Sequence, residues 1–190
     1  RERLAFNELL MLQIRNVYRK LSRQKKKAVY LFKVERESID TFISSLPFSL
    51  TRSQEHSVGE ILKDLGRDIP MNRLLEGDVG SGKTVVAAIA AFSAFVNGYQ
   101  SVFMAPTQIL AQQHFETLNS LFKKFKVRIS LITSETKREE LGRVDIYVGT
   151  HALIHQKINF DKVGLVVIDE QHRFGVEQRA HLVKRTGRKK

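Results

Sequence analysis

Apolar side chains in the first part of the chain recur with the period of an α-helix. The residues of this stripe follow one another at steps of three or four and are Phe6, Leu10, Ile14, Val17 and Leu21. This spacing predicts a helix over about residues 4–22, with its apolar face docked on a neighbouring surface. The lysine run at residues 25–27 is typical of a solvated helix end, and contact with DNA is the alternative interpretation.

Two shorter helices are expected in the next part of the chain. The first covers residues 37–45 and is stopped by Pro47. The second follows Thr51 and Gln54, whose S/T-x-x-E/Q spacing is that of a capping box at a helix N-terminus, and it ends at Gly66.

After these helices, apolar runs of strand length alternate with helical patterns. The expected strands are residues 73–75, 100–105, 127–132, 145–148 and 163–168. The expected helices are residues 85–95, 108–125 and 134–142. Such alternation favours parallel strands joined by right-handed crossovers. The predicted fold class is therefore α/β, with a mostly parallel, doubly wound sheet preceded by N-terminal helices.

The composition is that of a globular protein with one proper core, since 42% of the 190 residues are hydrophobic and 27% are charged. No apolar stretch has the length of a membrane-spanning helix, and the chain opens with Arg1-Glu2-Arg3 rather than with a signal peptide. We therefore expect a cytoplasmic protein without a membrane partner. The absence of cysteine excludes disulfides, thiolate catalysis and cysteine-ligated zinc, and the six histidines form no H-E-x-x-H pattern.

The charge of the chain is strongly basic and uneven. The formal net charge is +12 and the isoelectric point is near 10.1. Residues 1–36 hold eleven basic and three acidic residues, which is +8 of that total. A polyanionic partner is expected, and nucleic acid fits better than a membrane surface because the chain has no tryptophan-bearing amphipathic anchor.

The sequence LLEGDVGSGKT at residues 74–84 has the P-loop spacing G-x-x-x-x-G-K-[ST]. Its glycines let successive backbone N–H groups point at one phosphate chain, and the dipole of the following helix adds positive potential. Lys83 is expected to reach the β- and γ-phosphates, and Thr84 is expected to hold Mg²⁺. A glycine turn that binds nothing is the alternative. The residues predicted to bind the nucleotide here are Gly77, Asp78, Val79, Gly80, Ser81, Gly82, Lys83 and Thr84.

Two adjacent carboxylates, Asp169 and Glu170, follow the last apolar run. Parallel strands bring their carboxyl ends to one edge of the sheet, where such sheets bind ligands, so these carboxylates and the P-loop are expected to meet. Asp169 would complete Mg²⁺ coordination opposite Thr84, and Glu170 would orient or deprotonate the water that attacks the γ-phosphate. Carboxylates at a strand end are often solvated loop residues, which is the alternative.

Two turns at the same predicted edge suit a nucleic-acid strand. Pro106-Thr107 and Gly149-Thr150 offer backbone N–H groups and hydroxyls that can hold phosphates without reading sequence. Each turn alone is ordinary. The amide of Gln54 presents one acceptor and one donor, which is the pattern that selects an adenine edge, although the helix cap is the favoured role for this residue on physical grounds.

Five blocks of the sequence together resemble the first motor lobe of superfamily 2 helicases. They are LPFSLTRSQ, LLEGDVGSGKT, APTQILAQQHF, VGTHALI and VVIDEQHRFGVEQR. The last block is very similar to that of the RecG-type ATP-dependent DNA helicases, whereas DEAD-box RNA helicases differ there. The resemblance covers about residues 46–185.

The resemblance implies a RecA-like fold with ATP and Mg²⁺ as cofactors, and it adds roles for several residues. Gln54 would recognise adenine with Phe48 as an aromatic neighbour of the base. Gln171 and His172 would couple the nucleotide site to the nucleic-acid side. Pro106, Thr107, Gln112, Gly149 and Thr150 match blocks that touch the strand backbone in such motors.

The resemblance also implies partners within a longer parent chain. Residues 1–45 look like the helical linker that RecG-type proteins place before the motor, and residues 46–190 look like the first RecA-like lobe. A second RecA-like lobe and a wedge domain would complete a bacterial helicase that remodels branched DNA, such as stalled forks and Holliday junctions, in recombination and repair. A single lobe is expected to hydrolyse little ATP, because nothing closes over the γ-phosphate.

Two other functions remain open from the sequence, and a third is disfavoured. The first lobe of a transcription-repair coupling translocase is similar to that of RecG-type proteins. A non-hydrolysing module would use ATP to order a basic DNA-binding surface. A P-loop kinase of small molecules is disfavoured, because no basic lid segment or acceptor pocket is evident in the sequence.

Overall fold

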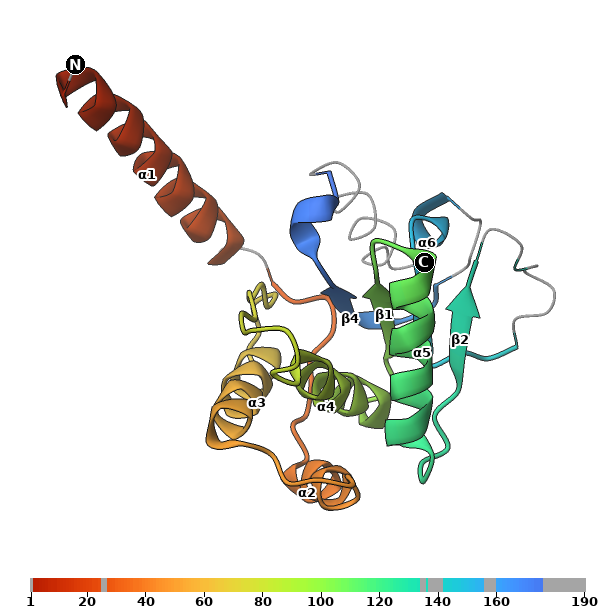
Figure 1. Cartoon of the computed structure of the whole chain (residues 1–190). Helices are drawn as coiled ribbons and strands as arrows, with labels where there is room; N and C mark the ends of the chain where they lie inside the picture. Colours follow the sequence, from red (N-terminus) through yellow and green to blue (C-terminus); the bar gives the residue numbers. More distant parts are fainter. Residues whose placement is uncertain (1, 25–26, 134–135, 137–141, 156–159, 176–190) are drawn as a thin grey trace.

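The computed structural model of the chain describes residues 2–24, 27–133, 136, 142–155 and 160–175 (Figure 1). Its helices are α1 (Glu2–Gln24), α2 (Arg36–Ser44), α3 (Arg52–Leu65), α4 (Lys83–Val96), α5 (Gln108–Phe122), α6 (Ala152–His155) and the 3-10 helix η2 (Gln171–Arg173). Its strands are β1 (Gln100–Met104), β2 (Ile129–Ile132), β3 (Ile146–Gly149) and β4 (Val163–Ile168). The expected helix at residues 134–142 lies almost entirely outside the described residues.

The described strands form one parallel sheet in the order β2-β3-β1-β4. In this register Met104 lies opposite both Gly149 and Ile168, so the carboxyl ends of three strands are aligned. The predicted α/β class with a parallel sheet is confirmed. The loops that follow β1, β3 and β4 therefore emerge at the same end of the sheet, the end formed by the carboxyl termini of the strands.

The two faces of the sheet pack against different helices, because side chains alternate along each strand. Phe103 of β1 and Val148 of β3 belong to a core that also contains residues of α2, α4 and α5. Val102 and Met104 of β1 point to the opposite face, where they form a second cluster with Leu153 of α6. Helix α4 is apolar nearly all round, as expected for a helix covered on several sides.

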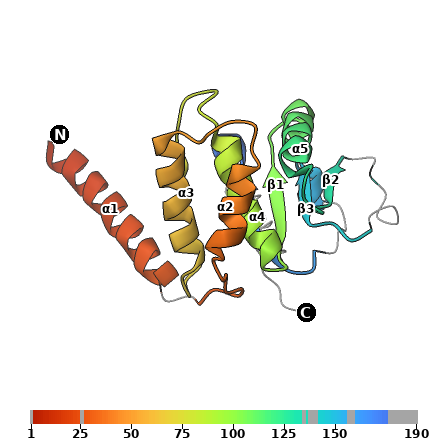
Figure 2. The same ribbon diagram turned by 90° about the horizontal axis from the view of Figure 1, so that it is seen from below.

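Helix α2 is part of the core between the sheet and helices α4 and α5, which we call the main core. Phe42 is fully buried and stacks on Phe92 of α4, with ring centroids 4.5 Å apart, and it also contacts Phe122 and Phe125. Figure 2 shows α2 beside α4. The sequence assigns this helix to the linker at residues 1–45, and in the structure it packs in the same core as α4 and α5.

Helix α1 confirms the predicted helix but differs from the expected docking. Its apolar stripe stays exposed, with Phe6, Ile14 and Leu21 each more than half accessible, and Figure 1 shows α1 extending away from the sheet. The described residues therefore provide no surface that covers this stripe.

The expected strand at residues 73–75 does not form. Residues 71–78 have no regular structure. Arg73 instead pairs with Asp64 at 2.7 Å and Glu60 at 2.8 Å, both on α3, while Leu75 packs against the main core. Side-chain ion pairs and one apolar anchor thus hold the segment before the P-loop, in place of a backbone ladder.

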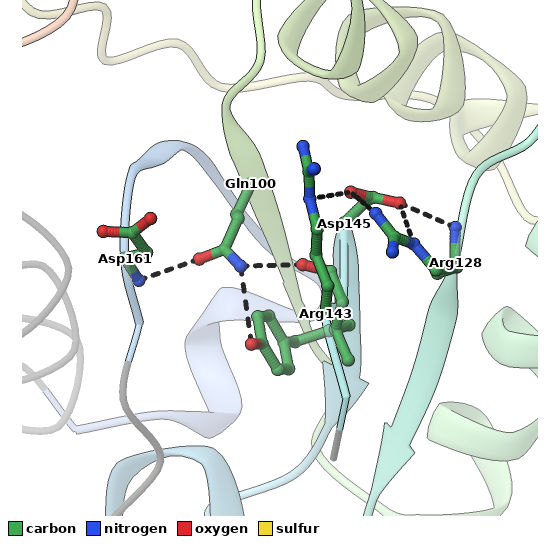
Figure 3. Close-up of polar contacts among 7 residues, drawn as sticks. Gln100, Arg128, Arg143, Asp145 and Asp161 are labelled. Carbon is green, nitrogen blue, oxygen red and sulfur yellow. Dashed lines mark hydrogen bonds and ion pairs between the residues drawn. The ribbon is translucent and has the colours of Figure 1, made fainter.

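A polar network fixes the amino-terminal edge of the sheet (Figure 3). The buried carboxylate of Asp145 accepts hydrogen bonds from the backbone N–H of Arg128 at 2.9 Å and from its guanidinium at 3.0 and 3.2 Å. The Gln100 amide donates to Val144 O at 2.7 Å and accepts from the Asp161 backbone N–H at 2.9 Å. Burial raises the pKa of Tyr147, whose hydroxyl the same amide reaches. These contacts tie together the starts of the strands.

The substitution Asp145→Asn is expected to destabilise the chain by about 1–3 kcal/mol, because it removes a buried acceptor of charge-assisted bonds and places amide donors against Arg128. Urea unfolding of the chain measures this loss. Asp161→Asn is the matched control, since Asp161 joins the network through its backbone N–H. Equal midpoints for the two variants would show that the Asp145 contacts contribute no stability.

Candidate nucleotide site and strand-contact edge

The P-loop at residues 77–84 has the backbone that its glycines predict. Gly80 and Gly82 both have φ of +81°, a conformation that disfavours side chains. A Cβ atom at Gly77 would lie 2.6 Å from Ser81 Oγ, and one at Gly82 would overlap the Gln54 amide. Val79 at the tip of the loop is fully exposed. Larger side chains at Gly77 and Gly82 would therefore fill space within the loop, whereas Gly80 is required for its positive φ.

Lys83 begins α4 and turns back over the loop. Its ammonium donates to the backbone carbonyls of Gly77 at 2.6 Å and Asp78 at 2.8 Å, while Ser81 N also donates to Asp78 O at 3.1 Å. These bonds hold the positive charge inside the curve of the loop. Thr84 follows in the first turn of α4, where the free backbone N–H groups of a helix favour anions.

Gln54 forms the helix cap that the sequence favours and also contacts the P-loop. Its Oε1 accepts from Thr51 N at 2.9 Å, and Gln54 N donates to Thr51 Oγ1 at 3.3 Å, so the predicted capping box is formed. Its Nε2 donates to Ser81 O at 2.8 Å, which joins α3 to the P-loop. A primary amide has two donors and two acceptor sites, so one donor and one acceptor site remain after these contacts. Phe48 lies 48% exposed a few residues before this cap.

The two carboxylates lie directly after β4. Asp169 N donates to Met104 O at 2.9 Å, which extends the pairing of β4 with β1, and Asp169 Oδ1 accepts from Glu170 N at 3.0 Å. Glu170 has φ of 48° and is the one described residue other than glycine with a positive φ. This conformation costs about 1–3 kcal/mol and is concentrated at functional sites. The strained backbone therefore lies at the second of two adjacent carboxylates.

Gln171 and His172 form the short helix η2 that follows this turn. Arg173 N donates to Glu170 O at 2.9 Å and closes the helix onto the carboxylate pair. Gln171 is exposed, and the side chain of His172 lies outside the described part of the chain. The residues that follow Gly175 in the quoted block also lie outside it.

His114 is a site residue that the sequence interpretation missed. It comes from α5, and its Nε2 lies 2.9 Å from Asp169 Oδ2. The two side chains are 17% and 31% exposed. Its place in APTQILAQQHF was the available signal, because helical geometry turns it to the opposite side of α5 from Gln112 two residues earlier.

The predicted strand-contact residues lie around the loops after β1 and β3. Thr107 caps α5 by accepting from Leu110 N at 3.2 Å, Pro106 is half-buried beside it, and Gln112 is exposed and donates to Glu116 at 2.7 Å. A groove of about 370 Å³ separates the start of α5 from the ends of β2 and β3. Residues that line it include Gln108, Ile109, Gln112, Leu131, Thr133 and Thr150.

The sequence predicts that Gly149 offers an exposed backbone N–H group to a nucleic-acid strand, and the structure differs. It is buried at the end of β3, and its carbonyl accepts from Ala105 N at 2.9 Å. A Cβ atom there would lie 2.6 Å from Ile132 O. Glycine is thus needed for the close approach of β2, and the accessible half of this pair is Thr150.

The residues of the P-loop and the β4 turn fit a Mg²⁺-bound nucleotide. Mg²⁺ in phosphate sites takes one or two protein oxygens, with phosphates and water as its other ligands. The hydroxyl of Thr84 and the carboxylate of Asp169 are ligands of that type. A cluster of three or more metal-binding side chains, which would indicate a different kind of centre, is absent from the described residues.

This combination of P-loop, paired carboxylates and parallel sheet agrees with the match to known families. The model of the DEAD/DEAH box helicase family matches residues 51–189, so the chain belongs to that family. It is similar in particular to ATP-dependent DNA helicase RecG. Identity is 45% with the protein from Synechocystis sp. and 46% with that from Bacillus subtilis, in each case over 96% of this chain.

A solved structure described as RecG bound to a three-way DNA junction has the same fold, with a TM-score of 0.81 and 43% identity over 92% of this chain. The UvsW helicase of bacteriophage T4, at 18% identity and a TM-score of 0.64, shares the fold. The chain spans about a quarter of its RecG relatives, 23% of the Synechocystis and 28% of the Bacillus protein. The predicted RecG-type resemblance and RecA-like fold are confirmed. No described helix is both long enough and apolar enough to cross a bilayer.

Proposed function

We propose that the chain is the first RecA-like lobe, and hence the ATP-binding motor lobe, of an ATP-dependent DNA helicase that remodels branched DNA in bacterial recombination and repair. The observation that carries this proposal is the pairing of a formed P-loop with a strained Asp169-Glu170 turn on a chain 45% identical to a RecG protein. A bacterial cytoplasmic location is consistent with these relatives.

ATP is the proposed nucleotide and Mg²⁺ the proposed metal. The glycine cradle and Lys83 would bind the phosphates, Gln54 and Phe48 the adenine, and Thr84 and Asp169 the metal, while Glu170 would act on the attacking water. Bound Mg²⁺ neutralises charge that develops on the transferred phosphoryl group. Gln171 and His172, on the same turn, would connect this site to the DNA side.

DNA is the proposed nucleic acid, either branched or single-stranded. The basic charge of the chain supplies attraction to phosphates. Gln112 and Thr150 line the groove between α5 and the ends of β2 and β3, and Pro106 and Thr107 lie in the loop that leads into α5. Gly149 would act as a structural support. A second RecA-like lobe and a wedge domain, both proposed to lie in the same parent chain, would supply closure over the γ-phosphate and separation of strands.

The DNA specificity is tested by ATP hydrolysis in the protein that carries this chain. A synthetic three-way junction is expected to stimulate hydrolysis tenfold or more above the rate without nucleic acid, and RNA of equal length is expected to stimulate it little. Equal stimulation by RNA and DNA would contradict the proposal. Hydrolysis that responds equally to linear duplex and to the junction would instead favour a translocase that does not recognise branches.

A further inference from the structure

The contact between His114 and Asp169 joins two parts of the lobe that the proposed function keeps separate. Asp169 belongs to the nucleotide side, and α5 belongs to the proposed strand-contact side. Between them lies the end of β1, to which Asp169 is bonded through Met104 O. His114 therefore reaches across the edge of the sheet to the carboxylate.

The hydrogen bonds of the Asp169 carboxylate fix its orientation and still leave it able to bind a metal. A carboxylate oxygen can accept but not donate, so Nε2 of His114 carries the proton in this contact. Oδ2 thus accepts from His114 and Oδ1 accepts from Glu170 N. An ionised carboxylate has about four lone-pair sites, so roughly two remain for a metal or its water.

Packing alone already secures the position of α5. Leu118 and Phe122 on this helix are buried in the main core, and Ala111 is buried at its start. Apolar burial therefore anchors this helix in addition to the polar contact. The contact of His114 is therefore better explained as a means of orienting the Asp169 carboxylate than as a means of holding α5.

We propose that His114 is a positioning residue that holds the Asp169 carboxylate in the orientation required for Mg²⁺ in the nucleotide site. This inference rests on the proposed function, in which Asp169 is a metal ligand. Groups that orient a metal ligand typically change metal affinity or activity by about 10- to 100-fold when removed.

The test measures the Mg²⁺ concentration that gives half of the metal-dependent gain in ATP affinity, in the protein that carries this chain and without nucleic acid. His114→Leu keeps the apolar volume but lacks a donor, and the half-saturating Mg²⁺ concentration is expected to rise about tenfold. His114→Gln offers an amide donor at a similar reach and is expected to restore a value near that of the wild type. Binding of ATP in the presence of a chelator should be the same in all three proteins.

Gln113→Leu is the control, because Gln113 is the exposed neighbour on the same helix. Thermal unfolding shows whether each variant is folded at the assay temperature. The inference is overturned if His114→Leu has the Mg²⁺ dependence of the wild type, or if His114→Gln is as impaired as His114→Leu. If the wild-type protein shows no Mg²⁺-dependent gain at all, the proposed function itself fails together with the inference.

Discussion

Replacement of Lys83 by alanine is expected to lower ATP hydrolysis by about 10²- to 10³-fold, which is the usual effect of removing one preorganised electrostatic donor from a transition state. ATP affinity should fall by about 10- to 100-fold, because a charge-assisted hydrogen bond contributes about 1.5–3 kcal/mol. The lysine holds its charge inside the loop through the carbonyls of Gly77 and Asp78. Steady-state hydrolysis and equilibrium titration with a fluorescent ATP analogue measure the two effects.

Two further variants separate position from charge. Lys83→Arg keeps the charge but replaces the compact ammonium that donates to the two carbonyls with a larger, planar group, so it should remain impaired. Lys123→Ala removes the same charge from the exposed end of α5 and should behave as the wild type. Hydrolysis by Lys83→Ala within a factor of three of the wild-type rate would contradict a phosphate-binding role for this loop.

Replacement of Glu170 by glutamine should separate hydrolysis from binding. The expected loss of hydrolysis is about 10²- to 10⁴-fold, as for removal of a general base, while ATP affinity should stay within about threefold. The reason is the division of roles in the proposal. Asp169, which accepts from His114 and from Glu170 N, would hold the metal, whereas Glu170 would act on the attacking water.

Glutamine is suitable for this test because it preserves side-chain length and the strained backbone while removing the negative charge. Glu37→Gln, on the exposed face of α2, is the matched control and should retain full activity. If the chain is part of a motor, Glu170→Gln loses ATP hydrolysis but keeps its affinity for ATP. A module that binds ATP without hydrolysing it predicts no change in either quantity for Glu170→Gln, and such a result would favour that alternative.

Local signals in the sequence predicted most of the fold. The capping box at Thr51 and Gln54, the apolar run of β4 and the glycine spacing of the P-loop each depend on residues close together in the chain, so pattern alone locates them. The same kind of signal predicts a strand at the three residues 73–75 before the P-loop. It fails because Arg73 is held by Asp64 and Glu60 of α3, and the local sequence does not show those contacts.

Features that depend on long-range packing were not predictable in the same way. The apolar stripe of α1 indicates a buried face, yet nothing in the periodicity says which surface covers it. The sequence of α2 likewise does not show that Phe42 stacks on Phe92 of α4. His114 and Asp169 are separated by 55 positions, and only the sheet order brings them within hydrogen-bond distance.

The central claim is that the P-loop and the β4 turn form one site for Mg²⁺ and ATP, and a double-mutant cycle on Thr84 and Asp169 tests it most directly. The measured quantity is the gain in ATP affinity on adding saturating Mg²⁺, compared among the wild type, Thr84→Ala, Asp169→Asn and the double variant. If both residues hold the same metal, each single variant loses part of this gain and the double variant loses clearly less than the sum of the two. Losses that add would show that the residues act independently, and would contradict a shared site.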